Sequence, residues 1–225
     1  MNITKTKDMK IGNLSVLIYG SPGMGKTTLL GNQKGRTLII DIDRGTTVLA
    51  GCENVDVIRV SKNLSEIQEV IKELHNKCDY DNVCIDSLSE LEQSFQGVLS
   101  ERNGTGVLSW QDYGKTNNFV LNCCRQLRSL NVNVLFTAWE KYIDMTAPSG
   151  DKYTRIVPML RDKNMENICG LCDIVGRIYT ARESGERAVW LEGRPDVLAK
   201  DRIFKRRSCS FDDVLSNETH EEIDS

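Results

Sequence analysis

The sequence contains no apolar run long enough to cross a membrane, and its first residues lack the apolar core of a signal peptide. We therefore expect a cytoplasmic protein without a membrane partner. Histidine is scarce, and no second cysteine or histidine pair accompanies Cys169 and Cys172 at zinc-site spacing. An isolated pair supplies two of the four ligands that structural zinc needs, so the sequence argues against a zinc site. Cys84 lies in an expected strand, and Cys123 and Cys124 lie in a helix expected at 115–130. We expect reduced thiols there that pack as small hydrophobic side chains.

Composition and charge are those of an ordinary folded chain. The 225 residues are 40% hydrophobic and 27% charged, which suits one domain with a sizeable core. The formal net charge is −3, but residues 212–225 contain six acidic residues and no lysine or arginine. We expect an N-terminal extension at 1–11, a folded domain at 12–207 and a disordered acidic tail at 208–225. A sharper hypothesis is that the tail competes with nucleic acid for the basic body of the chain.

One segment carries a specific motif. Residues 20–28 match the phosphate-loop pattern G-x-x-x-x-G-K-[ST], between an apolar run at 14–19 that reads as a strand and an apolar helix start. In such a loop the backbone amides point at phosphate oxygens, the lysine reaches the outer phosphates and the threonine hydroxyl binds Mg²⁺. The alternative is a chance glycine turn before a helix. The expected nucleotide-binding residues are Gly20, Ser21, Pro22, Gly23, Met24, Gly25, Lys26, Thr27 and Thr28.

Later strands end in polar residues that suit the same site. The apolar run at 81–87 ends in Asp86, which we expect to hold Mg²⁺ together with Thr27, although a helix cap is the alternative role. Asp41 and Asp43 end the strand at 37–43, and a carboxylate there can orient water toward a γ-phosphate. Thr137 ends the strand at 132–137, where we expect it to sense that phosphate.

The second half of the chain predicts further strands that extend a parallel sheet. Strands and helices alternate up to a helix near 164–171, and two strands follow at 173–179 and 187–191. We therefore predict an α/β fold with a mostly parallel sheet, flanking helices and a C-terminal antiparallel hairpin. Residues 140–158 are either a single-strand nucleic-acid loop or a β-hairpin with a solvated face. The residues expected to contact DNA are Lys141, Tyr142, Lys152, Tyr153 and Arg155.

Five segments in this order resemble the RecA-like ATPases, in particular the compact phage-encoded ATPases of recombination and single-strand annealing. They lie at 20–28, 38–45, 83–87, 110–114 and 199–202. The resemblance implies ATP and Mg²⁺ as cofactors, nucleotide held between self-associating subunits and a location in the host-cell cytoplasm. It also implies that Asp43 takes the place of a catalytic glutamate and that Lys200 and Arg202 reach a neighbour's nucleotide. The alternative for Lys200 and Arg202 is a charged surface turn. Residues 102–113 and 141–157 correspond to the DNA-facing loops of the family only by their order along the chain.

These observations favour an ATPase that binds single-stranded DNA in phage recombination or annealing, with a single-strand-binding protein as a further partner. Its catalytic residues would be Lys26, Asp43, Asp86, Thr137, Lys200 and Arg202. The alternative is a nucleotide-gated interaction or loading protein with weak hydrolysis, because Asp43 is shorter than glutamate. A small-molecule kinase ranks lower, since the one arginine-rich cluster comparable to a kinase lid lies at 205–207.

Overall fold

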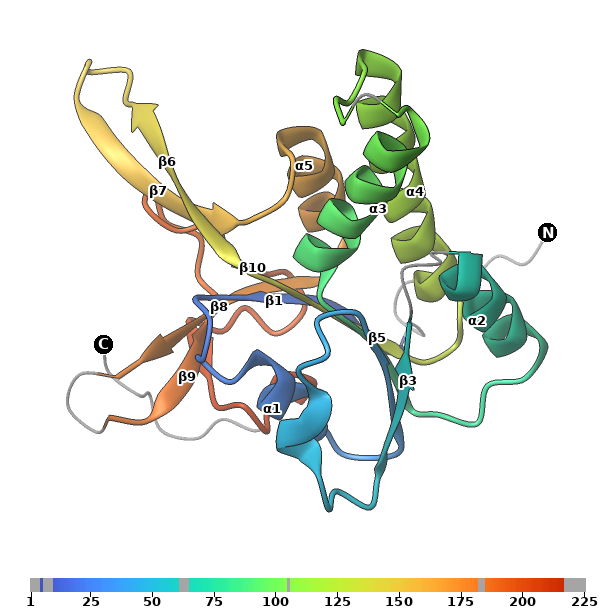
Figure 1. Cartoon of the computed structure of the whole chain (residues 1–225). Helices are drawn as coiled ribbons and strands as arrows, with labels where there is room; N and C mark the ends of the chain where they lie inside the picture. The colour runs from blue at the N-terminus through green and yellow to red at the C-terminus, as the bar shows by residue number, and fades with distance from the viewer. Residues whose placement is uncertain (1–4, 6–9, 61–64, 105, 182–184, 217–225) are drawn as a thin grey trace.

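The computed structural model describes residues 5, 10–60, 65–104, 106–181 and 185–216, which build a mostly parallel sheet with helices on both faces (Figure 1). This confirms the predicted fold class. The parallel strands follow the order β8-β1-β5-β4-β2-β3, and all but the edge strand β3 are largely buried, as their apolar sequences require. Their bounds are β1 Ser15–Tyr19, β2 Thr37–Asp41, β3 Val55–Arg59, β4 Asn82–Asp86, β5 Asn133–Ala138 and β8 Ile174–Thr180.

Two apolar layers lie on opposite faces of this sheet. Successive strand side chains alternate between the faces, so Leu17 packs in one layer and Ile18 in the other. Helices α2 to α5 cover the first face, whereas α1 and the short helix η2 cover the second (Figure 1). The bounds are α1 Lys26–Gly31, η2 Thr46–Leu49, α2 Ser65–Asn76, α3 Leu88–Arg102, α4 Trp110–Arg128 and α5 Asp162–Leu171.

Helix α4 begins five residues earlier than the sequence analysis placed it, at Trp110 instead of Lys115. The cause is a capping box. The Ser109 hydroxyl accepts a hydrogen bond from the amide of Asp112, and the Asp112 carboxylate accepts one from the amide of Ser109. The hydrogen bonds from Ser109 hold the pKa of Asp112 well below its usual range. Trp110 therefore lies on the first turn of a helix, where it is 89% exposed.

Antiparallel strands extend the sheet beyond β8. Strand β9 (Arg187–Trp190) pairs with β8, which confirms the predicted C-terminal hairpin, and β10 (Lys200–Asp201) also pairs with β8. Strand β11 (Ser208–Cys209) pairs with β9, so the folded body continues past residue 207, where the sequence analysis ended it. Asp213 is also buried, and the Arg206 guanidinium donates to its carbonyl oxygen at 2.6 Å. The rest of the expected tail, 217–225, lies outside the described residues, as does most of the expected N-terminal extension.

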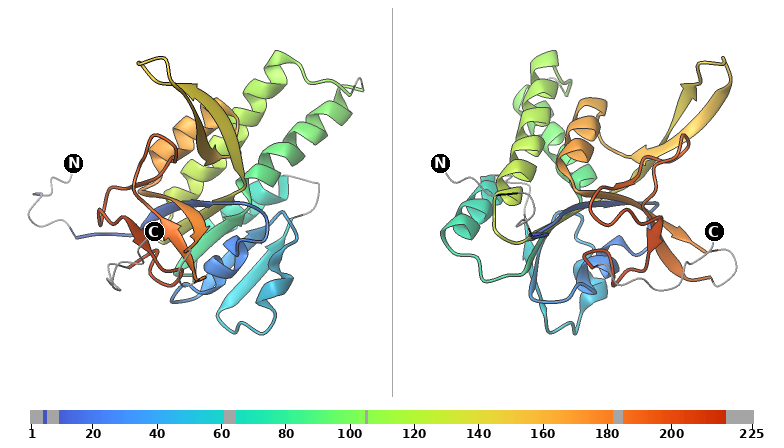
Figure 2. Two further views of the ribbon diagram at one scale, coloured as in Figure 1. Left: turned by 90° about the vertical axis from the view of Figure 1, so that its left-hand side faces the viewer. Right: turned by 180° about the vertical axis from the view of Figure 1, so that it is seen from behind.

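The segment at 140–158 is a two-stranded hairpin of β6 (Glu140–Thr146) and β7 (Lys152–Pro158), separate from the main sheet. It projects away from the body on the side that α3 and α4 occupy (Figures 1 and 2). Cys169 and Cys172 are buried free thiols, and burial raises the pKa of Cys169 to about 12. Within the described ranges, no helix is long and apolar enough to span a membrane.

Candidate functional site

The loop between β1 and α1 has the backbone shape of a phosphate-binding loop. Gly23 and Gly25 have φ angles of 80° and 90°, a left-handed conformation that side-chain-bearing residues adopt at a cost. Gly25 caps α1, so the free amides of the first helical turn face the loop. The amide of Gly20 donates to the carbonyl oxygen of Ala138 at 3.3 Å, which ties the loop to the end of β5. The loop therefore offers the amides and the helix terminus that an anion needs.

Lys26 is the buried cation of this loop. Its side-chain Nζ donates to the carbonyl oxygens of Gly20 and Ser21, at 3.0 Å and 2.9 Å. Burial lowers the pKa of Lys26, while the nearby carboxylates of Asp86, Asp43 and Glu140 act in the opposite direction. Because burial removes part of the water around this ammonium group, it gains more from a phosphate than an exposed lysine would.

Asp86 lies between two hydroxyl groups at the carboxyl end of β4. Thr27 Oγ1 donates to Asp86 Oδ2 at 2.6 Å, and Thr137 Oγ1 donates to Asp86 Oδ1. Burial raises the pKa of Asp86, the two hydroxyl hydrogen bonds lower it, and the negative charges of Asp43 and Asp41 raise it further. A buried carboxylate beside a threonine hydroxyl provides two hard oxygen ligands, so these residues fit Mg²⁺. Thr137, which we expected to sense a γ-phosphate, here orients Asp86.

The two acids after β2 have different surroundings. Asp43 Oδ1 accepts hydrogen bonds from the Ser87 amide at 3.1 Å and the Ser87 hydroxyl at 2.9 Å. Burial raises the pKa of Asp43 and Glu90 adds to the rise, whereas the Ser87 hydrogen bonds lower it. Asp41 is fully buried, and its Oδ2 accepts from Thr46 Oγ1 at 2.5 Å, which anchors the following loop.

A cavity of about 480 Å³ opens beside these acids, with Asp43, Glu90 and Trp139 in its wall. Glu90 lies in the first turn of α3, where the sequence analysis assigned it no role. The strand ends therefore bring Asp43 and Asp86 to one edge of the sheet, next to the P-loop, as their positions in the sequence predicted.

Glu140, which the sequence analysis did not single out, joins the P-loop to the projecting hairpin. The Ser21 hydroxyl donates to Glu140 Oε1 at 2.5 Å, and Arg177 Nε donates to Glu140 Oε2 at 2.9 Å. The Tyr142 hydroxyl also donates to Glu140, at 3.0 Å. Burial alone would raise the pKa of Glu140, but the hydrogen bonds from Arg177 and Ser21 hold it below its usual value. The signal in the sequence was weak: Glu140 lies three residues beyond Thr137, and Arg177 interrupts an apolar strand.

The residues expected to contact DNA divide between the two faces of the hairpin. The pairing of β6 with β7 puts Tyr142 and Lys152 on the exposed face, and Tyr142 is 62% exposed. Lys141, Tyr153 and Arg155 belong to the other face, which is half-buried. Lys141 Nζ donates to the carbonyl oxygen of Leu160 at 2.7 Å and to the Asp162 carboxylate at 3.1 Å, so its charge is already compensated.

Lys200 and Arg202 lie at the opposite edge of the sheet from the P-loop of the same chain. Lys200 pairs with Val175 near the amino end of β8, whereas the P-loop follows the carboxyl end of the parallel strand β1. Arg202 is bound to Asp173, with 2.9 Å between its Nε and Asp173 Oδ1. Lys200 and Arg202 therefore do not join the site within one chain.

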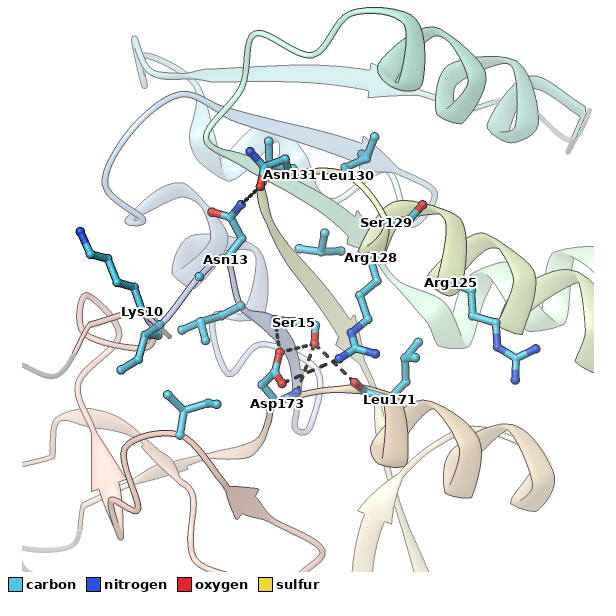
Figure 3. Close-up of a pocket in the computed structure, with 16 residues that line it drawn as sticks. Lys10, Asn13, Ser15, Arg125, Arg128, Ser129, Leu130, Asn131, Leu171 and Asp173 are labelled. Atoms are coloured by element: carbon cyan, nitrogen blue, oxygen red, sulfur yellow. Dashed lines mark hydrogen bonds and ion pairs between the residues drawn. The ribbon is translucent and has the colours of Figure 1, made fainter. Parts of the chain in front are cut away.

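A cavity of about 750 Å³ opens at the same edge of the sheet (Figure 3). The Ser15 amide and hydroxyl both donate to Asp173 there, at 2.9 Å and 2.6 Å, and Arg128 lies 4.0 Å from the same carboxylate. These contacts compensate Asp173 and connect the starts of β1 and β8. The cavity is thus remote from the P-loop, and the Asp173 carboxylate in its wall already has hydrogen-bond partners.

Comparison with known proteins shows the family to which the chain belongs. Two solved structures resemble the chain, each at a TM-score of 0.46, covering 88% of this chain and 84% of the other. They are a KaiC-like protein from Pyrococcus horikoshii OT3, at 14% identity, and the flagellar accessory protein FlaH from Methanocaldococcus jannaschii, at 11%. No curated protein has a matching sequence. A family model described as an AAA domain matches residues 12–203, so the chain belongs to the AAA domain family of P-loop ATPases.

Proposed function

We propose that this nucleotide-binding ATPase hydrolyses ATP with Mg²⁺ and acts on single-stranded DNA in phage recombination or annealing, in the cytoplasm of the host cell. The observation that carries the proposal is the contact between Ser21 and Glu140. It connects the loop that would hold the phosphates to the first residue of the projecting hairpin. A change in the P-loop on nucleotide binding therefore has a direct route to a surface that bears cationic and aromatic residues.

At the nucleotide, the amides of residues 20–28 would bind the phosphates and Lys26 would contact the outer ones. Thr27 and Asp86 would hold Mg²⁺, which neutralises phosphate charge when bound. Asp43 would orient the attacking water, because it lies beside Asp86 at the same strand edge. Thr137 keeps Asp86 in position through its hydroxyl hydrogen bond.

At the DNA, the exposed face of the hairpin would supply the contacts. Tyr142 offers a ring for base stacking, and Lys152 offers a positive charge for the phosphates of the DNA backbone. Lys141, Tyr153 and Arg155 would contribute from the half-buried face when the hairpin moves. The Tyr142 hydroxyl donates to Glu140, so the stacking residue and the P-loop share one carboxylate.

The test of DNA binding is fluorescence anisotropy of a labelled oligonucleotide with and without ATP. The proposal expects ATP to change the affinity of the wild-type protein and to have no effect on Lys26→Ala. Tyr142→Ala together with Lys152→Ala should weaken binding by about tenfold or more, given about 1–3 kcal/mol for each stacked base. Lys72→Ala, an exposed lysine on α2 away from the hairpin, is the matched control and should bind like the wild type. Equal binding by wild type and the hairpin variant would contradict the DNA assignment.

Subunits would hold the nucleotide between them, with Lys200 and Arg202 supplied by a neighbour. Their position at the far edge of the sheet favours this arrangement, because neither residue is near its own P-loop. Arg202 would exchange Asp173 for phosphate oxygens on assembly, and a cation supplied in this way can be worth about 10³–10⁵ in rate.

A nucleotide-gated loading protein with weak turnover is the second candidate, with a single-strand-binding protein as its partner. The favouring observation is that Ser87 donates twice to Asp43 Oδ1, which occupies one acceptor oxygen of a side chain already shorter than glutamate. Firm ATP binding without turnover above the uncatalysed rate would select this candidate.

A further inference from the structure

Two side chains from the last part of the chain lie against the P-loop. A Cβ atom on Gly25 would come within 2.7 Å of Arg187 Nη1 and within 3.1 Å of Phe211 Cε2. Arg187 is the first residue of β9, and Phe211 follows β11. The fold therefore places a guanidinium group and an aromatic ring on the same side of the glycine that caps α1.

Phe211 is held next to α1 by hydrogen bonds to its own backbone and to the residue that follows it. Its carbonyl oxygen accepts from Gln33 Nε2 at 2.9 Å, and the neighbouring Asp212 accepts from Asn32 Nδ2, also at 2.9 Å. The ring itself is partly exposed and packs, like Met24 of the P-loop, against the apolar layer under the sheet. The backbone of Phe211 is therefore anchored, and its partly exposed side chain lies beside the loop.

Arg187 brings a positive charge to the same place. Its backbone is held by the pairing of β9 with β8, opposite Thr180. Arg187 is exposed, and its guanidinium lies next to Gly25 of the P-loop. A guanidinium beside a phosphate-binding loop is suited to phosphate oxygens, which it binds through paired N–H groups.

We infer that Phe211 stacks on the base of ATP and that Arg187 binds its triphosphate. The inference rests on the proposed function, because it uses the same P-loop site. A ring and a guanidinium that lie beside the same residue of a phosphate loop match a ligand in which an aromatic base is joined to a triphosphate. Stacking on an aromatic ring and ion pairing with phosphate are independent contributions, so different ligands can separate them.

The test compares the binding of ATP with that of inorganic tripolyphosphate, which lacks the base, by calorimetry with Mg²⁺ and the full chain. Phe211→Leu keeps an apolar side chain against α1 but removes the ring, whereas Phe211→Tyr keeps the ring. We expect Phe211→Leu to weaken ATP binding about tenfold and to change tripolyphosphate binding less than about twofold. Phe211→Tyr should bind both ligands like the wild type. Arg187→Ala should weaken both ligands by a similar factor, about tenfold.

Two results would overturn the inference while the proposed function stands. One is equal weakening of ATP and tripolyphosphate by Phe211→Leu, which would make the ring a support for the loop only. The other is unchanged ATP affinity in Phe211→Leu and Arg187→Ala when Lys26→Ala still abolishes binding. If the wild type and Lys26→Ala bind ATP equally or not at all, the proposed function fails, and this inference fails with it.

Discussion

Ser21 of the P-loop donates a 2.5 Å hydrogen bond to Glu140, the first residue of the projecting hairpin. The Glu140 side chain is 3% exposed and is also paired with Arg177, whose side chain is 24% exposed. The contact is therefore a partly buried connection between the P-loop and the hairpin that projects from the body of the molecule.

Glu140→Ala should uncouple these two regions. The substitution removes the acceptor of Ser21 and leaves Arg177 without its partner, at a cost of about 1–3 kcal/mol in the free energy of unfolding. We expect ATP affinity to remain within about threefold of wild type, while stimulation of ATP turnover by single-stranded DNA is lost. Turnover measured at increasing DNA concentration checks this, with Glu166→Ala on the surface of α5 as the control. Full DNA stimulation in Glu140→Ala would show that the contact is structural.

Asp86→Asn should affect the stability of the fold and the binding of Mg²⁺ and ATP in different ways. Burial raises the pKa of Asp86 in the folded state, so folding favours its protonated form. This stability is complete below the unfolded pKa of about 4 and is lost as pH rises through the folded pKa. In the absence of nucleotide we therefore expect the free energy of unfolding of the wild type to fall as pH rises above 4. The fall should be smaller in Asp86→Asn, which has no carboxyl group to deprotonate at this position. Urea unfolding of both proteins between pH 4 and pH 7 measures it.

The same substitution should weaken Mg²⁺-dependent ATP binding by about tenfold or more, because it removes a charged ligand. If the free energy of unfolding depends on pH in the same way in the wild type and in Asp86→Asn, the raised pKa of Asp86 is refuted. Unchanged Mg²⁺ dependence would refute the metal role, independently of the pH result.

Arg206→Ala should destabilise the fold strongly. The side chains of Arg206 and Asp201 are 7% and 0% exposed and lie 2.7 Å apart, so truncation leaves a buried charge unpaired. The expected loss is about 3–5 kcal/mol in the free energy of unfolding. Arg207→Ala is the neighbouring control, because its side chain is 70% exposed and 3.9 Å from Glu192, and such a pair contributes about 0–1 kcal/mol. Urea unfolding compares the two variants, and equal losses would contradict the structural role of the buried Arg206–Asp201 ion pair.

Mixed subunits test whether Lys200 and Arg202 act between chains. Lys26→Ala lacks its own phosphate contact, and Arg202→Ala lacks the cation offered to a neighbour. Each should be inactive alone, and a mixture should recover part of the ATP turnover at interfaces that combine an intact P-loop with an intact Arg202. Absence of recovery in mixtures that still co-assemble, measured by light scattering, would leave Arg202 as the structural partner of Asp173.

The sequence predicted the P-loop and the order of strands because both depend on local patterns. Gly20 to Thr27 form a fixed motif, and an apolar strand that ends in Asp86 is recognisable without knowledge of its neighbours. The start of α4 was missed because the capping box at Ser109 and Asp112 was overlooked, although its signal is local.

Other features depend on contacts between distant segments. Glu140 with Arg177, and Gly25 with Arg187 and Phe211, meet only after the sheet has formed, so no spacing in the sequence indicates them. The end of the domain was placed too early for a similar reason. An acidic composition suggested a tail, but Asp213 becomes buried near Arg206.

ATP turnover by the purified protein, with and without single-stranded DNA and beside Lys26→Ala, tests the central claim most directly. The account predicts turnover that rises with DNA in the wild type and is absent in Lys26→Ala, whose phosphate contact is lost. Lys72→Ala, an exposed position on α2, serves as a lysine control and should behave like the wild type. Turnover that DNA leaves unchanged, or that persists in Lys26→Ala, would contradict the account.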